Sequence, residues 1–235
     1  MTEKNIKARE PRVVRLKFIK VGVLQYISHL DLQRTMARVL ARSRIPVWYT
    51  EGFNPHIKLV FAAPLAVGVE SVCELFDIRV TGEISCEEIV RRMNDELTGE
   101  LRVVEAYYPK TKFSEIAAAD YVYKIKTAGA GDELAARIKS FLTTSPVMVT
   151  KKTKSGEKEI GIAGVINRLE VSFSETEGTL EMSARLPAGS RLSISPELPV
   201  DALRAGGLIL AGDMTEEGYS ILRTRLLFAD GREFR

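Results

Sequence analysis

The segment from Tyr26 to His56 concentrates the residue types of this chain that could do chemistry. It contains both histidines of the 235-residue chain, its single tryptophan and a regular series of arginines, in the sequence YISHLDLQRTMARVLARSRIPVWYTEGFNPH. Histidine titrates near neutral pH and can act as a general acid or base, whereas arginine presents a planar fork of donors that suits phosphate. The segment could therefore form a catalytic centre, a surface that binds a charged partner, or only a capped helix followed by a turn.

The arginines of this segment recur at helical spacing. Arg34, Arg38 and Arg42 stand at positions i, i+4 and i+8, so they line one stripe of a helix. Like charges at this spacing repel one another by about a few tenths of a kcal/mol per pair. Either an anionic partner lies beside the stripe, or acidic groups of a second helix, such as Glu87 or Glu88, come alongside and neutralise it.

The first histidine stands at a helix start. Ser28 precedes the predicted helix and Asp31 follows three residues later, which is close to a capping box with Asp in the usual Glu position. The positive end of the helix disfavours a charged imidazole, so His29 is expected to be neutral. It could serve as a hydrogen-bonding group or general base, or it could be a half-buried histidine that only supports the chain.

The second histidine ends the turn sequence EGFNPH. Gly52 is flexible and the Asn54-Pro55 pair is rigid, a combination that can hold Phe53 and His56 at a surface. Three more aromatics are interleaved with basic residues nearby: Tyr26, Trp48 and Tyr49. Mixtures of aromatic and basic side chains are typical of single-stranded nucleic-acid binding, although each aromatic taken singly is more often part of a core.

Charge is distributed unevenly along the chain. The net charge is only +3, but residues 1–50 contain eleven Lys and Arg against three Asp and Glu, a local balance of +8. Lys20 belongs to this basic part, and a second basic patch, KKTKSGEK, contains Lys151, Lys152 and Lys154. A concentrated basic face is typical of proteins that bind polyanions, and the alternative is an ordinary solvated surface.

Several classes of function find no support in the motifs. Cys73 and Cys86 lie in no metal-binding or CxxC spacing, so neither a metal site nor a disulfide is expected. The phosphate-binding patterns GxxxxGK[ST] and GxGxxG are absent, as is a CxxxCxxC run, and no cofactor is expected. Neither a signal peptide nor a membrane span is indicated, so the expected location is the cytoplasm.

Hydropathy patterns predict a repeated order of elements. Period-two alternation or short apolar runs indicate strands at 12–22, 45–49 and 101–109, and one long or broken strand pair over 57–68 and 73–82. Period 3.6 indicates helices at 29–43 and 85–97. Reduced to its elements, this is the βαββαβ order of a ferredoxin-like domain. A similar order follows, with strands at 121–128, 146–153 and 219–229, strands within 169–186 joined by a hairpin around Glu177-Gly178, and helices at 131–143 and 195–206.

The predicted fold is therefore α+β, with two tandem ferredoxin-like (βαββαβ) domains built on antiparallel sheets. The predicted domains are residues 1–115, which contain the SHLD helix start and the GFNPH turn, and residues 116–235. The linker is placed near KTKFSEIAAAD. Two domains of this length fit ordinary domain sizes.

The sequence resembles the radical-SAM-linked protein family, a bacterial domain of unknown function. The resemblance is specific over residues 14–80 and weaker over the rest. Its residues are Lys20, Ser28, His29, Leu30, Asp31, Arg34, Arg38, Gly52, Phe53, Asn54, Pro55, His56, Leu65, Gly68, Ser71, Glu74 and Asp77. The chain departs from the family pattern at Gly161-Ile162-Ala163, where an Asp-Ile-Arg sequence is typical.

Members of this family occur beside, or fused to, a radical SAM protein, so the resemblance implies such a protein as partner. The expected function is a non-catalytic, RNA-binding or substrate-presenting accessory protein in RNA modification. Its expected contacts to RNA or to the partner are Lys20, Ser28, His29, Asp31, Arg34, Arg38, Arg42, Phe53, Asn54, His56, Lys151, Lys152 and Lys154. The alternatives are a protein–protein adaptor and, third, a metal-independent endoribonuclease that uses His29 or His56.

Overall fold

A computed structural model describes residues 10–144, 148–153, 156–190, 192–213 and 215–235. The chain divides into two compact units, and each is described by itself. The first unit comprises the described residues of 1–67, 72–112 and 235, and the second comprises those of 68–71 and 113–234.

The first unit follows the predicted element order. Its elements are β1 (Arg12–Lys20), a 3-10 turn (Gly22–Tyr26), α1 (His29–Arg42), β2 (Val60–Phe61), β3 (Glu70–Val80), α2 (Cys86–Asn94) and β4 (Leu101–Tyr107). The segment 45–49, expected to be a strand, contributes only isolated pairings, Val47 with Val80 and Tyr49 with Ile57. Helix α1 begins at the predicted cap Ser28, and α2 begins in the same way after Ser85, because the hydroxyl oxygens of both serines accept backbone N–H groups of the first turn.

The second unit contains one strand that the sequence did not predict, β7 (Gly156–Gly161), which pairs with the predicted strand at 146–153. Its elements are β5 (Ala118–Lys126), α3 (Asp132–Thr144), β6 (Met148–Thr153), β7 (Gly156–Gly161), β8 (Asn167–Ser174), β9 (Thr179–Pro187), α4 (Leu198–Ala205) and β10 (Gly218–Leu227). Strands β6 and β7 form a separate two-stranded sheet. Pro199 lies in the first turn of α4, where its missing N–H costs nothing, so it starts this helix rather than breaking one.

Each unit has its own strand order. In the first unit the hydrogen-bonded order is β4-β1-β3, and β2 pairs with β3; in the second unit it is β10-β5-β9-β8. The pairings of β1 with β4, β10 with β5, β5 with β9 and β8 with β9 are antiparallel. Glu70 and Ser71, which belong to the second unit, pair with β10 in parallel, so the strand pairing of this unit is mixed where a purely antiparallel sheet was expected. The structure agrees with the predicted α+β class, and its described residues contain four helices. The tandem ferredoxin-like assignment stays a prediction.

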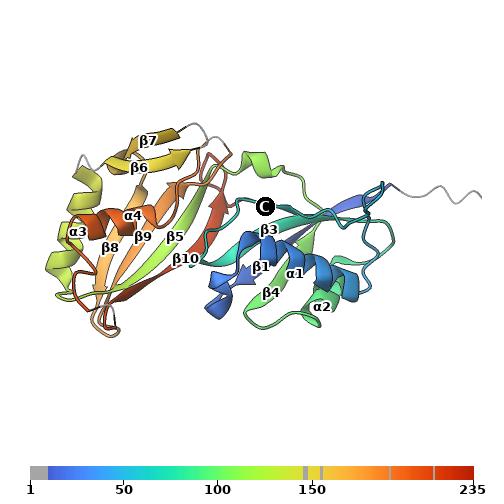
Figure 1. The fold of residues 1–235 in the computed structure, drawn as a ribbon, viewed down its shortest axis with the longest axis horizontal. Helices are drawn as coiled ribbons and strands as arrows, with labels where there is room; N and C mark the ends of the chain where they lie inside the picture. The colour runs from blue at the N-terminus through green and yellow to red at the C-terminus, as the bar shows by residue number, and fades with distance from the viewer. Residues whose placement is uncertain (1–9, 145–147, 154–155, 191, 214) are drawn as a thin grey trace, which may run out of the picture. The chain divides into compact units, whose positions relative to one another are not determined.

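Each unit buries its own apolar side chains. In the first unit the core joins the inner face of α1 to the sheet through Val14, Leu16, Phe18, Leu32, Met36, Val39, Leu40, Phe76, Ile78, Ile89 and Met93. In the second unit, α3 and α4 lie on one face of the sheet (Figure 1), and the alternating residues Leu180, Met182, Ala184 and Leu186 of β9 are buried. Among the described residues, none of the helices combines the length and hydropathy that crossing a bilayer requires.

The contribution of this packing can be tested on one helix with one residue type. Leu40 of α1 is fully buried, whereas Leu30 of the same helix is 54% exposed. Leu40→Ala should lower the free energy of unfolding by about 2–5 kcal/mol, because it removes buried methyl groups and leaves a cavity. The matched variant Leu30→Ala should change it by less than about 0.5 kcal/mol. Urea unfolding followed by circular dichroism measures both, and equal losses would contradict this packing.

Candidate functional site

The start of α1 is a closed network of short-range hydrogen bonds. The Ser28 hydroxyl accepts the backbone N–H of Asp31 at 3.1 Å and donates to its Oδ2 at 2.7 Å. Arg34 donates to Oδ1 of the same carboxylate at 3.2 Å. The Ser28 hydrogen bond and then that of Arg34 lower the pKa of Asp31. Asp31 is thereby kept as an anion beside the Ser28 cap, where it faces the positive end of the helix.

His29 is half-buried against an aromatic side chain. Its ring meets that of Phe61 edge to face, with centroids 5.3 Å apart. Its Nε2 lies 3.0 Å from the side-chain nitrogen of Gln33. An amide nitrogen can only donate, so Nε2 of the imidazole accepts this bond. This is a supporting role, and no carboxylate among the described residues hydrogen-bonds the ring.

The arginine stripe is exposed and partly neutralised. Arg34 pairs with Asp31, and Arg42 pairs with Glu96 at 2.8 Å. Arg38 makes no hydrogen bond or ion pair with any described residue. Pairs as exposed as these stabilise a protein by only about 0–1 kcal/mol, so their arginines could exchange partners readily.

Arg42 is neutralised from the predicted helix segment 85–97, but by Glu96 rather than by Glu87 or Glu88. Glu88 of α2 is engaged by Arg91 and Arg92, whose hydrogen bonds lower the pKa of Glu88 to about 2. The carboxylate that reaches Arg42 instead comes from Glu96, just beyond the end of α2. Its side chain could not be singled out from the sequence, because the pairing spans 54 residues.

The GFNPH turn is a defined loop with an aromatic tip. It is closed at its base by Tyr49 and Ile57, and within it Thr50 and His56 exchange backbone and side-chain hydrogen bonds of 2.9 and 3.1 Å. The Nδ1 of His56 also lies 3.1 Å from the carbonyl oxygen of Asn54. Phe53 is fully exposed, with a relative accessibility of 113%. The loop therefore holds a phenyl ring in solvent.

Gly52 permits this loop shape. Its φ of +116° lies in a region that residues with a Cβ rarely adopt. No atom lies within 4 Å of where its Cβ would be, so backbone conformation, rather than space, favours glycine here. Within the described chain, no hydrogen bond or ion pair joins residues 52–56 to α1, and the structure thus gives two groups of candidate residues instead of one.

The remaining predicted site residues lie elsewhere. Lys20 is in the interior, only 2% exposed, and its Nζ donates to the carbonyl oxygen of Gln25 at 3.1 Å. Lys151 and Lys152 belong to β6, where their backbones pair with Lys158 and Glu157. The side chains of these two lysines and the whole of Lys154 lie outside the described residues.

A buried ion pair was not foreseen. Arg15 of β1 is charged, but its side chain is only 1% exposed. Its Nε and Nη2 donate to the two carboxylate oxygens of Asp77 at 2.8 and 3.0 Å, and two further bonds reach Thr111. Asp77, which belongs to the family-like pattern, therefore has a structural role that only the fold reveals.

A row of three charged side chains crosses the sheet of the second unit. Asp120 of β5 lies opposite Arg185 of β9 and Arg225 of β10. It accepts Arg185 bonds at 2.6 and 3.0 Å and lies 2.7 Å from Arg225. Burial alone would raise the pKa of Asp120, but the hydrogen bonds and charges of the two arginines outweigh burial and lower it.

Comparison with known proteins gives a family. The model of the family DUF2344, described as an uncharacterized protein conserved in bacteria, matches residues 13–196. The chain belongs to this family. The match includes α1, the GFNPH loop, the Arg15–Asp77 ion pair, and Asp120 and Arg185 of the charged row in the second unit. The candidate residues of the first unit are therefore part of the DUF2344 region. No curated protein shows a significant match.

Solved structures resemble the DUF2344 chain only weakly. A protein of unknown function from Galdieria sulphuraria is 9% identical over 91% of this chain and 99% of its own, with a TM-score of 0.26. A variant of DypB from Rhodococcus jostii, determined in complex with heme, is 13% identical over 90% of this chain and 93% of its own, with a TM-score of 0.21.

The charged row gives a prediction for pH dependence. Because the folded pKa of Asp120 is depressed, its stabilising contribution is complete above the unfolded value of 3.8 and is lost as the pH falls through the folded value. At pH 7, Asp120→Asn should lower the free energy of unfolding by about 1.5–3 kcal/mol, as expected for charged hydrogen bonds. The difference from the wild type should shrink towards pH 2.

Urea unfolding at pH 7, 4 and 2 measures this difference. The control is Asp95→Asn, because the Asp95 carboxylate is exposed and, among the described residues, pairs with Arg91 alone. A penalty for Asp120→Asn that stays constant across this range would contradict the ionic role of the row.

Proposed function

We propose that the protein is a non-catalytic adaptor that docks on a radical SAM enzyme through the GFNPH loop. The observation that carries this proposal is the full exposure of Phe53 at the tip of a loop held by its own hydrogen bonds. Burying a phenyl side chain stabilises a complex by about 1.5–3 kcal/mol, and a preformed loop spends little ordering entropy on binding. Aromatic anchors of this kind often dominate the affinity of protein interfaces.

Other exposed apolar groups support docking on a protein. Val23, Tyr26 and Leu30 lie within eight consecutive residues at the start of α1, and they are 71%, 67% and 54% exposed. Apolar side chains gathered on a surface are typical of sites that bind other proteins. The identity of the partner rests on the sequence resemblance, which implies a radical SAM protein.

The strand order of each unit supports the ferredoxin-like assignment. We infer two ferredoxin-like units, because each places its last strand beside its first: β4-β1-β3-β2 in the first unit and β10-β5-β9-β8 in the second. Strands β6 and β7 are then an inserted hairpin in the second unit. This assignment concerns architecture only and does not by itself imply a reaction.

RNA binding is the second candidate, and Arg38 favours it. Its guanidinium is exposed without a described partner, between two arginines whose exposed ion pairs are weak. An endoribonuclease has less support, because His29 is engaged by Gln33 and Phe61, and His56 by its own loop. If His29→Ala and the wild type are equally inactive towards structured RNAs, no case remains for cleavage.

Docking is tested by copurification of the protein with its proposed radical SAM partner after nuclease treatment. Phe53→Ala should weaken the complex by at least about tenfold, because it removes the anchor. The matched control is Tyr108→Ala, which shortens an exposed aromatic of the same unit outside the loop. Calorimetric titration measures the Kd, and equal affinity of both variants would refute the role of Phe53.

The same purified protein can be tested for RNA binding. If RNA is the ligand, fluorescence anisotropy should show affinity that falls steeply with added salt, since bound phosphates release counterions. Arg38→Ala should then weaken binding and reduce the salt slope by about one, whereas Arg102→Ala on β4 should not. Absence of binding at low salt would remove this candidate.

A further inference from the structure

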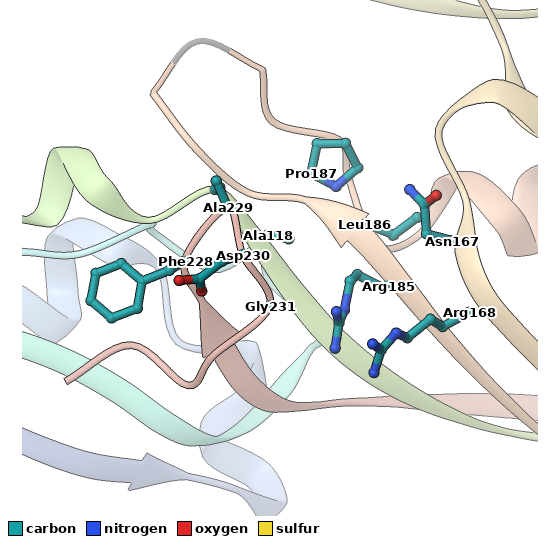
Figure 2. Close-up of a pocket in the computed structure, with 11 residues that line it drawn as sticks. Ala118, Asn167, Arg168, Arg185, Leu186, Pro187, Phe228, Ala229, Asp230 and Gly231 are labelled. Atoms are coloured by element: carbon teal, nitrogen blue, oxygen red, sulfur yellow. The ribbon is translucent and has the colours of Figure 1, made fainter.

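The second unit contains a pocket of about 460 Å³ that no motif of the sequence indicated. It is lined by residues of four separate segments: 117–118 at the start of β5, 167–168 at the start of β8, 185–187 of β9, and 228–231 after β10. Figure 2 shows Arg185 and Arg168 extending from neighbouring strands in a similar direction, with Phe228 and Asp230 on the other side of the pocket.

Arg168 has an unusual backbone. It is a non-glycine residue with a φ of +49°, and it lies where the register of β8 against β9 shifts between Asn167 and Glu170. An extra residue in one strand is a β-bulge, and bulges often redirect a side chain beside a functional site. The side chain of Arg168 makes no hydrogen bond or ion pair with any described residue. A strained position with an unpaired guanidinium is not explained by stability.

Arg185 is fixed in place with one nitrogen left over. Its Nε and Nη2 are engaged by Asp120, while Nη1 has no acceptor among the described residues. Gly231 lets the chain pass close to it: a Cβ at this position would lie 3.2 Å from Nη1, and the φ of Gly231 is +84°. The pocket therefore contains two guanidinium groups. That of Arg185 is held in place by Asp120, and that of Arg168 is free to bind a ligand.

The charges around the pocket do not balance. Arg168 and Arg185 line the pocket, and Arg225, which does not line it, shares the Asp120 carboxylate with Arg185, so three positive charges meet one negative charge there. Asp230 does not compensate them, because it is engaged by the backbone and side chain of Arg232. The excess is close to +2, which matches a phosphate monoester near its dianionic form better than it matches a carboxylate.

We propose that this pocket binds the phosphoryl group of a small phosphorylated molecule. Arg168 and the free Nη1 of Arg185 hold the phosphate, and Asn167, which lies opposite Arg185, adds an amide donor. The pocket is larger than a phosphoryl group, and the ring of Phe228 and the side chain of Pro187 form apolar walls for the rest of the molecule. This site is separate from the loop proposed to dock a partner, so either proposal can fail alone.

The test is a titration of the ¹⁵N-labelled full chain with sodium phosphate at pH 7.5, at constant ionic strength set with NaCl. Saturable shifts are expected in backbone amides of 117–118, 167–168 and 228–231. A parallel titration with sodium acetate should give weaker binding. Absence of saturable shifts at these positions up to about 20 mM, or equal binding of acetate, would overturn the proposal.

Variants assign the effect to one side chain. Arg168→Gln should weaken phosphate binding by at least about tenfold, since it removes a charged donor. Arg137→Gln is the matched control, because Arg137 is an exposed arginine of α3 that does not line the pocket, and its affinity should be unchanged. Arg168→Gly accepts the positive φ, so it should keep the thermal midpoint of the wild type and still lose binding. Wild-type affinity in either Arg168 variant would refute the site.

Discussion

The ion pair of Arg15 with Asp77 is the constraint on which the first unit depends. A guanidinium with 1% exposure must have its donors satisfied, since an unpaired buried charge costs several kcal/mol. Asp77 and Thr111 satisfy Arg15, and in doing so they fix β1 to β3 and to the segment that follows β4. Such a pair adds little net stability compared with apolar residues, but it penalises other registers of the strands. The sheet that supports α1 is thus specified by polar as well as apolar groups.

Local signals predicted the helices well. Ser28 and Ser85 mark the starts of α1 and α2 because a cap depends on residues only three positions apart. The buried face of α1, Leu32, Met36, Val39 and Leu40, follows from helical period alone. Strand predictions were less accurate where pairing is sparse: β2 has two residues, and residues 45–49 form only isolated pairings.

The sequence could not predict contacts between residues that are far apart along the chain. The burial of Arg15 depends on Thr111, 96 residues away, and the neutralisation of Arg42 depends on Glu96. The bulge at Arg168 leaves no local signature, because the strained residue is an arginine rather than a glycine. Of the candidate residues, Ser28, His29, Asp31 and Arg34 do lie together, as their sequence proximity suggested, whereas the GFNPH loop forms a separate group.

The bulge at Arg168 also bears on how the protein avoids self-association. Strand β8 is the last in the strand order of the second unit, and a terminal strand can template the addition of a strand from another molecule. An irregular start with a positive φ interrupts the even spacing of backbone donors and acceptors, and an exposed cation beside it repels an identical copy. The residue that lines the pocket thus also makes this margin of the sheet a poor template for a further strand.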